Sequence, residues 1–364
     1  MRADRAIAIA VILAFSGMAG LGAWLLSGTP GTLVNEAPPV LGPAAEADGE
    51  PVILVVAPGE TASDVAENLA AAGVIESSRL FRVLASLMGV GDDLIAGEYE
   101  FRRGETALTT VRRISQGHTS PLVVTVLEGL RVEEIAELLE RRNVVSGDEF
   151  KRALGDQYSG SFLEALPPAT ALEGFLFPAT YGFSRTAGGH EVVQLLLDAF
   201  DQRYREEILP RLVVASSDLT LLQIVTLASI IEREARVAEE RPLIASVFIN
   251  RLEAGFLLQA DPTVQYAVGS DPASSDEFGY WKRELTLADL AIDSPYNTYV
   301  SVGLPPGPIA NPGLDSLLAA LEPADTNFLF FVACDDGSGR HAFAETLEEH
   351  NLNVSQSGGG ECPE

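Results

Sequence analysis

A long apolar helix near the middle of the chain places the strongest constraint on the fold. Residues 219–235 read LTLLQIVTLASIIEREA, with apolar side chains on nearly every face before Glu232. A helix that is apolar all round is stable in water only when other elements cover it. Ser217 or Asp218 is a suitable N-cap for this helix. The pattern therefore predicts a buried central helix around which the rest of the fold packs.

Two carboxylates end this helix, and they point to different sides because one turn holds about 3.6 residues. Glu234 lies over Ile230 and Ile231, and apolar surroundings raise the pKa of a carboxyl group. A carboxyl group that is neutral near neutral pH can act as a general acid. Glu232 has Arg236 at i+4, which favours a structural ion pair for this residue.

A third acid, Glu173, lies in the aromatic stretch LEGFLFPATYGF (172–183). A structural interpretation is open for each acid, because a buried carboxylate needs a partner. Glu173 can be a turn residue or a backbone cap. Glu234 can pair with a distant arginine such as Arg251, or lie in water at a frayed helix end. Glu234 is favoured as the general acid because a rigid helix holds it on an apolar face.

Three polar stretches after the central helix are expected to be loops: 258–267, 294–299 and 303–313. They combine amide, carboxyl and hydroxyl groups with aromatic rings, a mixture suited to binding sugars. The polar and aromatic residues concerned are Gln259, Asp261, Thr263, Gln265, Tyr266, Asn297, Thr298 and Tyr299. Asp261 and Asn297 are also common turn formers. The cluster as a whole favours a binding site.

Composition excludes several classes of function. A net charge of -28 argues against nucleic acid, whose phosphates need a basic face. The sequence has no P-loop, no GxGxxG after a strand, no GxSxG and no HExxH. Cys334 and Cys362 lack metal-ligand spacing, so neither a metal nor another cofactor is expected. A disulfide between the two cysteines and a pair of free thiols are both compatible with the sequence.

The N-terminus predicts a membrane anchor. Arg2 and Arg5 precede an uncharged apolar run over 6–27, long enough for the roughly 30 Å of bilayer hydrocarbon. Acids follow the run, so the positive-inside rule places residues 1–27 as a cytoplasmic stub and transmembrane helix, with the rest extracytoplasmic. A cleaved signal peptide is the alternative, but no clean A-x-A site closes the run.

The remaining chain predicts an α+β protein. Residues 28–51 are rich in Pro, Ala, Gly and acids and are expected to form a disordered linker. Residues 52–145 contain two strand–turn–helix units that form a weak internal repeat and resemble LysM-like modules. Such modules bind glycans, although a repeat this diverged can equally be scaffold. A mixed α/β catalytic domain is expected over 146–354 and a flexible tail over 355–364.

Six ordered motifs give the chain a specific resemblance. LEGFLFPATY, ASIIEREA, VFINRL, LQADPTVQYA, SPYNTY and GLPPGPIANPG follow in the order and spacing of the MltG-type (YceG-like) endolytic murein transglycosylases. The resemblance runs from about Val52 to Val354, and the predicted anchor also fits it. Phe175 and Phe177 stand where relatives often have Trp, which can alter sugar stacking. The tail SGGGECPE has no counterpart in the resemblance.

The resemblance implies non-hydrolytic cleavage of the β-1,4 bond between MurNAc and GlcNAc in nascent glycan strands. It implies that Glu234 is the catalytic acid and base and that the product ends in 1,6-anhydroMurNAc. Peptidoglycan synthases are implied as partners. The substrate-binding residues expected near Glu234 are Glu173, Phe175, Phe177, Gln259, Asp261, Asn297 and Tyr299. A membrane-anchored peptidoglycan-binding protein without catalysis is the main alternative, and a membrane-tethered assembly scaffold is a third.

Overall fold

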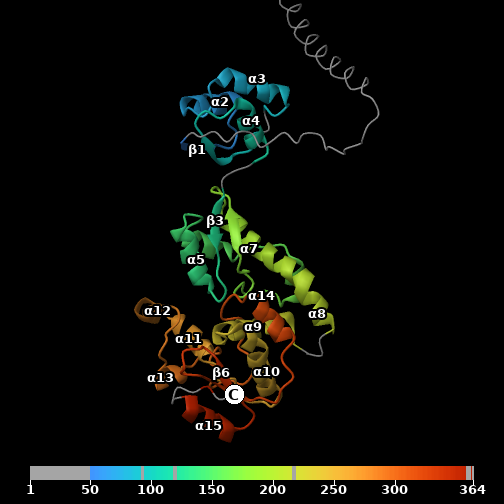
Figure 1. Cartoon of the computed structure of the whole chain (residues 1–364), viewed down its shortest axis with the longest axis vertical. Coiled ribbons are helices and arrows are strands. Elements are labelled where there is room, and N and C mark those ends of the chain that lie inside the picture. The colour runs from blue at the N-terminus through green and yellow to red at the C-terminus, as the bar shows by residue number, and fades with distance from the viewer. Residues whose placement is uncertain (1–49, 92–93, 118–120, 215–218, 358–361, 363–364) are drawn as a thin grey trace, which may run out of the picture. The chain divides into compact units, whose positions relative to one another are not determined.

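The computed structural model describes residues 50–364 except 92–93, 118–120, 215–218, 358–361 and 363–364 (Figure 1). The predicted anchor over 1–27 and nearly all of the linker over 28–51 lie outside this range. Within the described residues, no helix is both long enough and apolar enough to cross a membrane. Three separate two-stranded antiparallel sheets accompany the helices, so the predicted α+β class is confirmed for the folded part.

The first folded segment has its own apolar core. Strand β1 (Pro51–Val56) pairs antiparallel with β2 (Gly97–Arg102), and Leu54 lies opposite Tyr99. The core of this segment includes Val65, Phe81 and Tyr99, all fully buried. The helices that cover it are α2 (Ala62–Ala71), α3 (Ser78–Leu87) and α4 (Ala107–Ser115).

The second core begins at Val124, inside the range 52–145 that the sequence pattern assigns to the LysM-like region. Strand β3 (Leu122–Thr125) pairs antiparallel with β4 (Thr180–Phe183), and Val124 lies opposite Tyr181. Val124 packs with residues of the second core, as does Ile135 of helix α5 (Val132–Arg141). The predicted LysM-like range 52–145 therefore spans parts of two cores. The strand pairing separates the two units of the weak repeat, because β1 and β3 pair with different partners.

Helices build most of the second core. The longest of the elements that precede the central helix is α7 (Figure 1). The elements before the central helix are α6 (Gly147–Ala153), η1 (Ser161–Ala165), α7 (Gly189–Arg203), η2 (Tyr204–Ile208) and α8 (Leu209–Val214).

The central helix is α9 (Leu221–Glu234), and it is buried as predicted. Every residue from Ile224 to Ile231 is buried. Helices α10 (Arg241–Glu253), α11 (Asp261–Gly269) and α14 (Leu314–Leu321) pack against α9 (Figure 1). The N-cap is Thr220 rather than Ser217 or Asp218, since Thr220 and Gln223 form a reciprocal capping box.

One stretch predicted as a loop is helical. Helix α11 starts at Asp261, with Pro262 in its first turn. Proline is favoured there because the first turn leaves its N–H groups unbonded in any case. Gln259, just before the helix, has a φ of 50°, so the chain turns sharply into α11.

The C-terminal elements close the second core. They are η3 (Ala238–Glu240), α12 (Pro272–Phe278), α13 (Leu287–Leu290), β5 (Phe330–Ala333), β6 (His341–Ala344) and α15 (Leu347–Ser357). The apolar run FLFFVA over 328–333 predicts a strand buried on both faces, but the residues of β5 are half-buried or exposed. Among the described residues, β5 pairs with β6 alone, in a two-stranded sheet. A disulfide joins Cys334 to Cys362 and ties the tail to the end of β5.

Candidate functional site

Glu234 is the last residue of α9, and its carboxyl group is partly buried. Burial raises the pKa of Glu234 to about 8, and the negative charge of Asp261 acts in the same direction. Nearby arginines oppose this shift, led by Arg236. In the described part of the chain, no group donates a hydrogen bond to this carboxyl. The side chain is therefore a neutral acid at pH 7 whose oxygens are available to a ligand.

Asp261 and Tyr299 form a pair beside Glu234. The Tyr299 hydroxyl donates a hydrogen bond to Asp261 Oδ1 at 2.6 Å. Burial, followed by the contact with Asp261, raises the pKa of Tyr299, so it remains a donor. The negative charge of Asp261 acts on the Glu234 carboxyl and raises its pKa. Two predicted binding residues thus lie close to the predicted acid.

Arg251 does not form the ion pair with Glu234 that was open as an alternative. Its Nε donates to the carbonyl of Leu329 at 2.6 Å, and one terminal nitrogen donates to the carbonyl of Leu258 at 2.7 Å. These backbone bonds hold the guanidinium in place. Its positive charge lowers the pKa of Glu234 only through space, as the last of the arginine contributions.

Glu232 is structural, but its partners differ from those predicted. The Ser316 hydroxyl donates to Glu232 Oε2 at 2.7 Å, and the Gly313 N–H donates to the same oxygen at 3.0 Å. Arg241 lies 3.7 Å from Glu232 Oε1, whereas Arg236 forms no ion pair with it. The side chain of Glu232 is 8% exposed. It therefore joins α9 to α10 and to the start of α14.

Glu173 is enclosed by hydrogen bonds. The Val132 N–H lies 3.2 Å from both carboxyl oxygens, and Asn311 Nδ2 donates to Oε1 at 2.9 Å. Burial raises the pKa of Glu173 to about 8, even though these donors oppose the shift. The amide oxygen of Asn311 also accepts from the backbone of Gly174 and Leu176. Glu173 is thus a buried connector between α5 and the segment before α14.

Two further predicted binding residues differ in exposure. Asn297 is fully buried and donates to the carbonyls of Leu290 and Ile292, while its own carbonyl oxygen accepts from the Tyr299 N–H. It therefore shapes the loop that carries Tyr299. Gln259 is exposed, and its side chain is open to solvent next to the start of α11.

The two phenylalanines of the aromatic stretch lie in the core. Phe175 is fully buried and packs on Phe162 and Phe200, with ring centroids 5.5 and 5.1 Å apart. Phe177 is 6% exposed, with the guanidinium of Arg203 over its ring. In this structure neither ring faces a surface that a sugar can reach. Their expected stacking on sugars has no support from these positions.

The structure adds an arginine–aromatic group that the sequence pattern did not reveal. The guanidinium of Arg233 lies 3.8 Å from the ring centroid of Trp281, and that of Arg131 lies 4.1 Å from the ring of Tyr266. Trp281 follows α12 by only a few residues, far from α9 in the sequence. The position of Arg233 between two acids is the one sequence feature that could have indicated this group.

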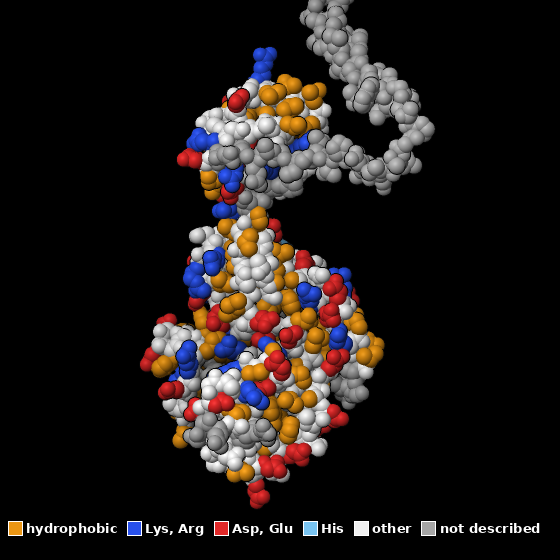
Figure 2. Space-filling model, in the orientation of Figure 1, with side chains coloured by type: hydrophobic (Ala, Val, Ile, Leu, Met, Phe, Trp, Pro, Cys, Tyr) orange, Lys and Arg blue, Asp and Glu red, His pale blue; other side chains and the backbone are white. Residues whose placement is uncertain are grey.

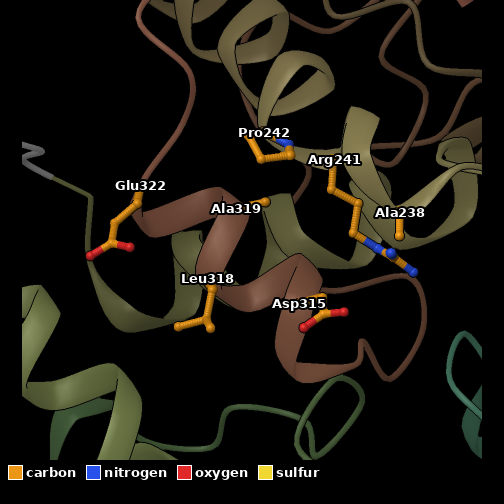
Figure 3. A pocket seen from close by; sticks show the side chains of 7 residues that line it. All are labelled: Ala238, Arg241, Pro242, Asp315, Leu318, Ala319 and Glu322. Atoms are coloured by element: carbon orange, nitrogen blue, oxygen red, sulfur yellow. The ribbon is translucent and has the colours of Figure 1, made fainter.

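A cavity of about 810 Å³ opens beside this group. Its lining residues come from the end of α9 and from α11 and the segment after α12: Arg233, Arg236, Gln265, Phe278, Gly279, Tyr280, Trp281 and Arg283. A smaller cavity of about 250 Å³ lies between α10 and α14 (Figure 3). Arg241 lines it together with Asp315 and Glu322. Arg241 also contacts Glu232, so this second cavity lies on the structural side of α9.

Metal chemistry has no cluster to support it among the described residues. No group of three or more His, Cys, Asp or Glu side chains is arranged there to hold a metal ion. With its raised pKa and accessible oxygens, Glu234 can donate and recover a proton without a cofactor.

Comparisons with known proteins show which family the chain is similar to. Residues 54–356 match the model of the YceG-like family. A Bacillus subtilis protein named endolytic murein transglycosylase is 33% identical over 80% of this chain and 81% of its own length. A Streptococcus pneumoniae protein of the same name is 28% identical over 82% of this chain, which spans only 57% of the pneumococcal protein.

A solved structure has the same fold over most of the chain. The 2.6 Å crystal structure of a yceG-like protein from Listeria monocytogenes is 30% identical in sequence, with a TM-score of 0.54. The match covers 83% of this chain and 98% of the Listeria chain. Because the family model matches well over half of the sequence, this chain belongs to the YceG-like family.

Proposed function

We propose that this chain is an endolytic peptidoglycan lytic transglycosylase whose general acid and base is Glu234. The names of its Bacillus and Streptococcus relatives support this activity. The observation that carries the assignment is the state of Glu234: it ends a buried helix, its pKa is raised to about 8, and its oxygens are open to a ligand. Glu173 has a similar pKa but is closed off by hydrogen bonds.

One carboxyl group is enough for this reaction. Neutral Glu234 donates its proton to the oxygen that bridges MurNAc to GlcNAc, and the bond from that oxygen to MurNAc C1 breaks. The Glu234 carboxylate then takes the proton of the MurNAc C6 hydroxyl, and O6 bonds to C1. No water is consumed, and Glu234 ends as it began. Burial favours the first proton transfer, and the arginines nearby stabilise the carboxylate between the two steps.

We propose that Gln259, Asp261 and Tyr299 contact the sugar next to Glu234. Tyr299 and Asp261 already form a donor–acceptor pair, and Gln259 is exposed at the start of α11. Asn297 is fully buried and bonded to the Tyr299 backbone, so its role is to position Tyr299. Glu173 holds α5 and Asn311 in the same indirect way.

The substitution Glu234→Gln tests the assignment. It keeps the size of the side chain but removes the proton, so cleavage of purified glycan strands should fall by about 10²–10⁴. Mass spectrometry of the wild-type products should show 1,6-anhydroMurNAc ends. Glu239→Gln is the matched control, because Glu239 is exposed and lies close by in sequence.

Three outcomes of that experiment would contradict the proposal. Wild-type products with reducing ends would indicate hydrolysis and a second catalytic carboxylate. A Glu234→Gln chain with full activity would show that another group carries the chemistry. Binding to glycan without cleavage by the wild type would favour the non-catalytic alternative.

We further propose that the segment around β1 and β2 binds glycan, as LysM-like modules do. A cavity of about 460 Å³ on this segment has hydroxyl groups and an arginine in its lining, which suit sugar hydroxyls. The lining comes from the start of α2 and the end of α3: Thr61, Ala62, Ser63, Arg82, Ser86, Gly89 and Gly91. Ser63→Trp should block this cavity and weaken binding of uncleaved strands, as measured by pull-down.

We propose that residues 6–27 anchor the chain in the cell membrane, with the catalytic part outside and peptidoglycan synthases as partners that supply nascent strands. The charge pattern of the N-terminus supports this topology. The Cys334–Cys362 disulfide is also suited to an oxidising compartment. A reporter enzyme that works only outside the cytoplasm should be active when fused after Glu364. Activity of a cytoplasm-only reporter at the same position would overturn the topology.

A further inference from the structure

The cavity of about 810 Å³ beside Glu234 has an unusual charge for this chain. Three arginines line it, and none of its lining residues is Asp or Glu. The whole chain carries 52 acidic against 24 basic residues, and acidic side chains are spread over the visible face (Figure 2). The cavity between α10 and α14, in contrast, has two acids in its lining. A local excess of positive charge in so acidic a protein indicates an anionic ligand.

The aromatic wall of this cavity is held in place from behind. Trp281 Nε1 donates to Glu134 Oε2 at 2.9 Å, and the Tyr280 hydroxyl donates to Glu137 Oε1 at 2.7 Å. Both acceptors belong to α5. The rings are therefore fixed before any ligand arrives, and they offer flat surfaces to planar groups.

Two of the three arginines in the lining are exposed and available to a ligand. Arg233 is held more firmly: its guanidinium lies over Trp281, its Nε is buried, and one terminal nitrogen donates to the carbonyl of Gly129 at 3.3 Å. Arg236 and Arg283 are exposed, and neither has an acidic partner within 4 Å among the described residues. Guanidinium groups bind carboxylates with paired hydrogen bonds, which adds both strength and direction.

The cavity adjoins the proposed reaction centre. Arg233 and Arg236 flank Glu234 in sequence, and their charges act on its carboxyl. Gln265 in the lining lies one turn of α11 beyond Asp261, about 6 Å along the helix axis. The substituents of a ligand bound at Glu234 can therefore reach this cavity.

We propose that this cavity binds the acidic peptide stem carried by the MurNAc unit at the cleavage site. This inference rests on the proposed function and names a specificity that the reaction does not require. The stem is attached to the same sugar whose C1 and C6 react, and it carries carboxylates and planar amide groups. The arginines recognise the carboxylates, and Tyr280 and Trp281 contact the amides. The protein accordingly prefers strands that keep their peptides over strands stripped of them.

Binding measurements on the full-length Glu234→Gln chain test the proposal without cleavage. Peptide-bearing strands should bind about 5- to 20-fold more tightly than the same strands after removal of the stems by an amidase. Adding Arg283→Gln should weaken binding of the peptide-bearing strands by about 3- to 10-fold and reduce the preference accordingly. Arg142→Gln is the control, because Arg142 is exposed at the end of α5 and outside the cavity.

The outcomes separate the possible ligands. Equal binding of both kinds of strand, or an equal loss on both with Arg283→Gln, would overturn the proposal. A loss confined to strands that end in a lipid pyrophosphate would assign the arginines to phosphate instead. Absence of 1,6-anhydro products from the wild type would contradict the proposed function, whereas the preference in binding would remain a separate result.

Discussion

Glu173, Glu232 and Glu234 carry the same carboxyl group, and their neighbours give each a different role. Glu232 accepts hydrogen bonds from Ser316 and Gly313 and lies near Arg241. Glu173 is enclosed by donors, although burial still raises its pKa. Glu234 has a raised pKa and no protein donor in the described residues. Only this combination leaves a proton that can be given to a ligand.

The pH dependence of cleavage should follow the pKa of Glu234. The acid must be protonated at the start, so activity should be lost as the pH rises through about 8. The charge of Asp261 raises this pKa, so Asp261→Asn should move the descending limb to lower pH. The profile of kcat/KM against pH measures the shift. An unmoved limb would mean that the charge of Asp261 does not act on the catalytic group.

The protonation of Glu234 should also make the free energy of unfolding depend on pH. In the unfolded chain Glu234 has a pKa near 4.5, and in the folded protein near 8. Between pH 4.5 and about 8, Glu234 therefore holds a proton in the folded protein but not in the unfolded chain. Its contribution to the free energy of unfolding is fully present below pH 4.5 and is lost as the pH rises through about 8. Glu234→Gln removes this dependence, so its free energy of unfolding should rise relative to wild type over that range.

Urea unfolding of both proteins at about pH 5, 7 and 9 checks this expectation. The first two pH values lie between the two pKa values of Glu234, and the third lies above both. For the control Glu239→Gln, whose side chain is exposed, the difference in free energy of unfolding from wild type should be the same at all three pH values. A constant difference for Glu234→Gln would mean that its pKa is the same in the folded and unfolded chains.

At the scale of elements, α9 provides a rigid and buried support for the site. Its apolar residues pack against α10, α11 and α14, so the position of Glu234 is set by three neighbouring helices. The C-cap residue Ala235 has extended backbone angles, and the chain leaves the helix directly after Glu234. Glu234 therefore lies on a rigid helix yet next to an open end.

The junction at Glu232 should be a point of high sensitivity. Glu232→Ala would leave Arg241 and Ser316 without their carboxylate partner inside the fold. The loss should cost about 2–4 kcal/mol of unfolding free energy. Glu232→Gln keeps an acceptor oxygen and should cost less. Urea unfolding gives both values, and equal stability of Glu232→Ala and wild type would show that the junction is not structural.

At the scale of the whole molecule, two apolar cores and a disulfide hold the described chain together. One core lies within the segment from β1 to α4, and the other extends from β3 to the C-terminal elements. The Cys334–Cys362 disulfide joins residues 28 positions apart and secures the tail beyond α15. Within the predicted tail over 355–364, α15 continues to Ser357 and Cys362 is bonded to Cys334.

Removal of the disulfide should destabilise the second core. A crosslink that closes a loop of this length contributes about 3–4 kcal/mol in the chain-entropy account. Cys362→Ser should therefore lower the midpoint of urea unfolding, and a reducing agent should have the same effect on wild type but none on the variant. An identical midpoint for oxidised wild type and variant would show that the tail contributes nothing to the fold.

The sequence alone determined what depends on neighbours within a few positions. Apolar periodicity identified the buried helix α9, and the ordered motifs identified the family and predict Glu234 as the acid. Partners distant in sequence were decided only by the tertiary structure. Arg241 rather than Arg236 lies by Glu232, and the expected sugar-stacking Phe175 packs in the core. Packing sets the burial and the charges around a side chain, and these cannot be read from the residues beside it in the chain.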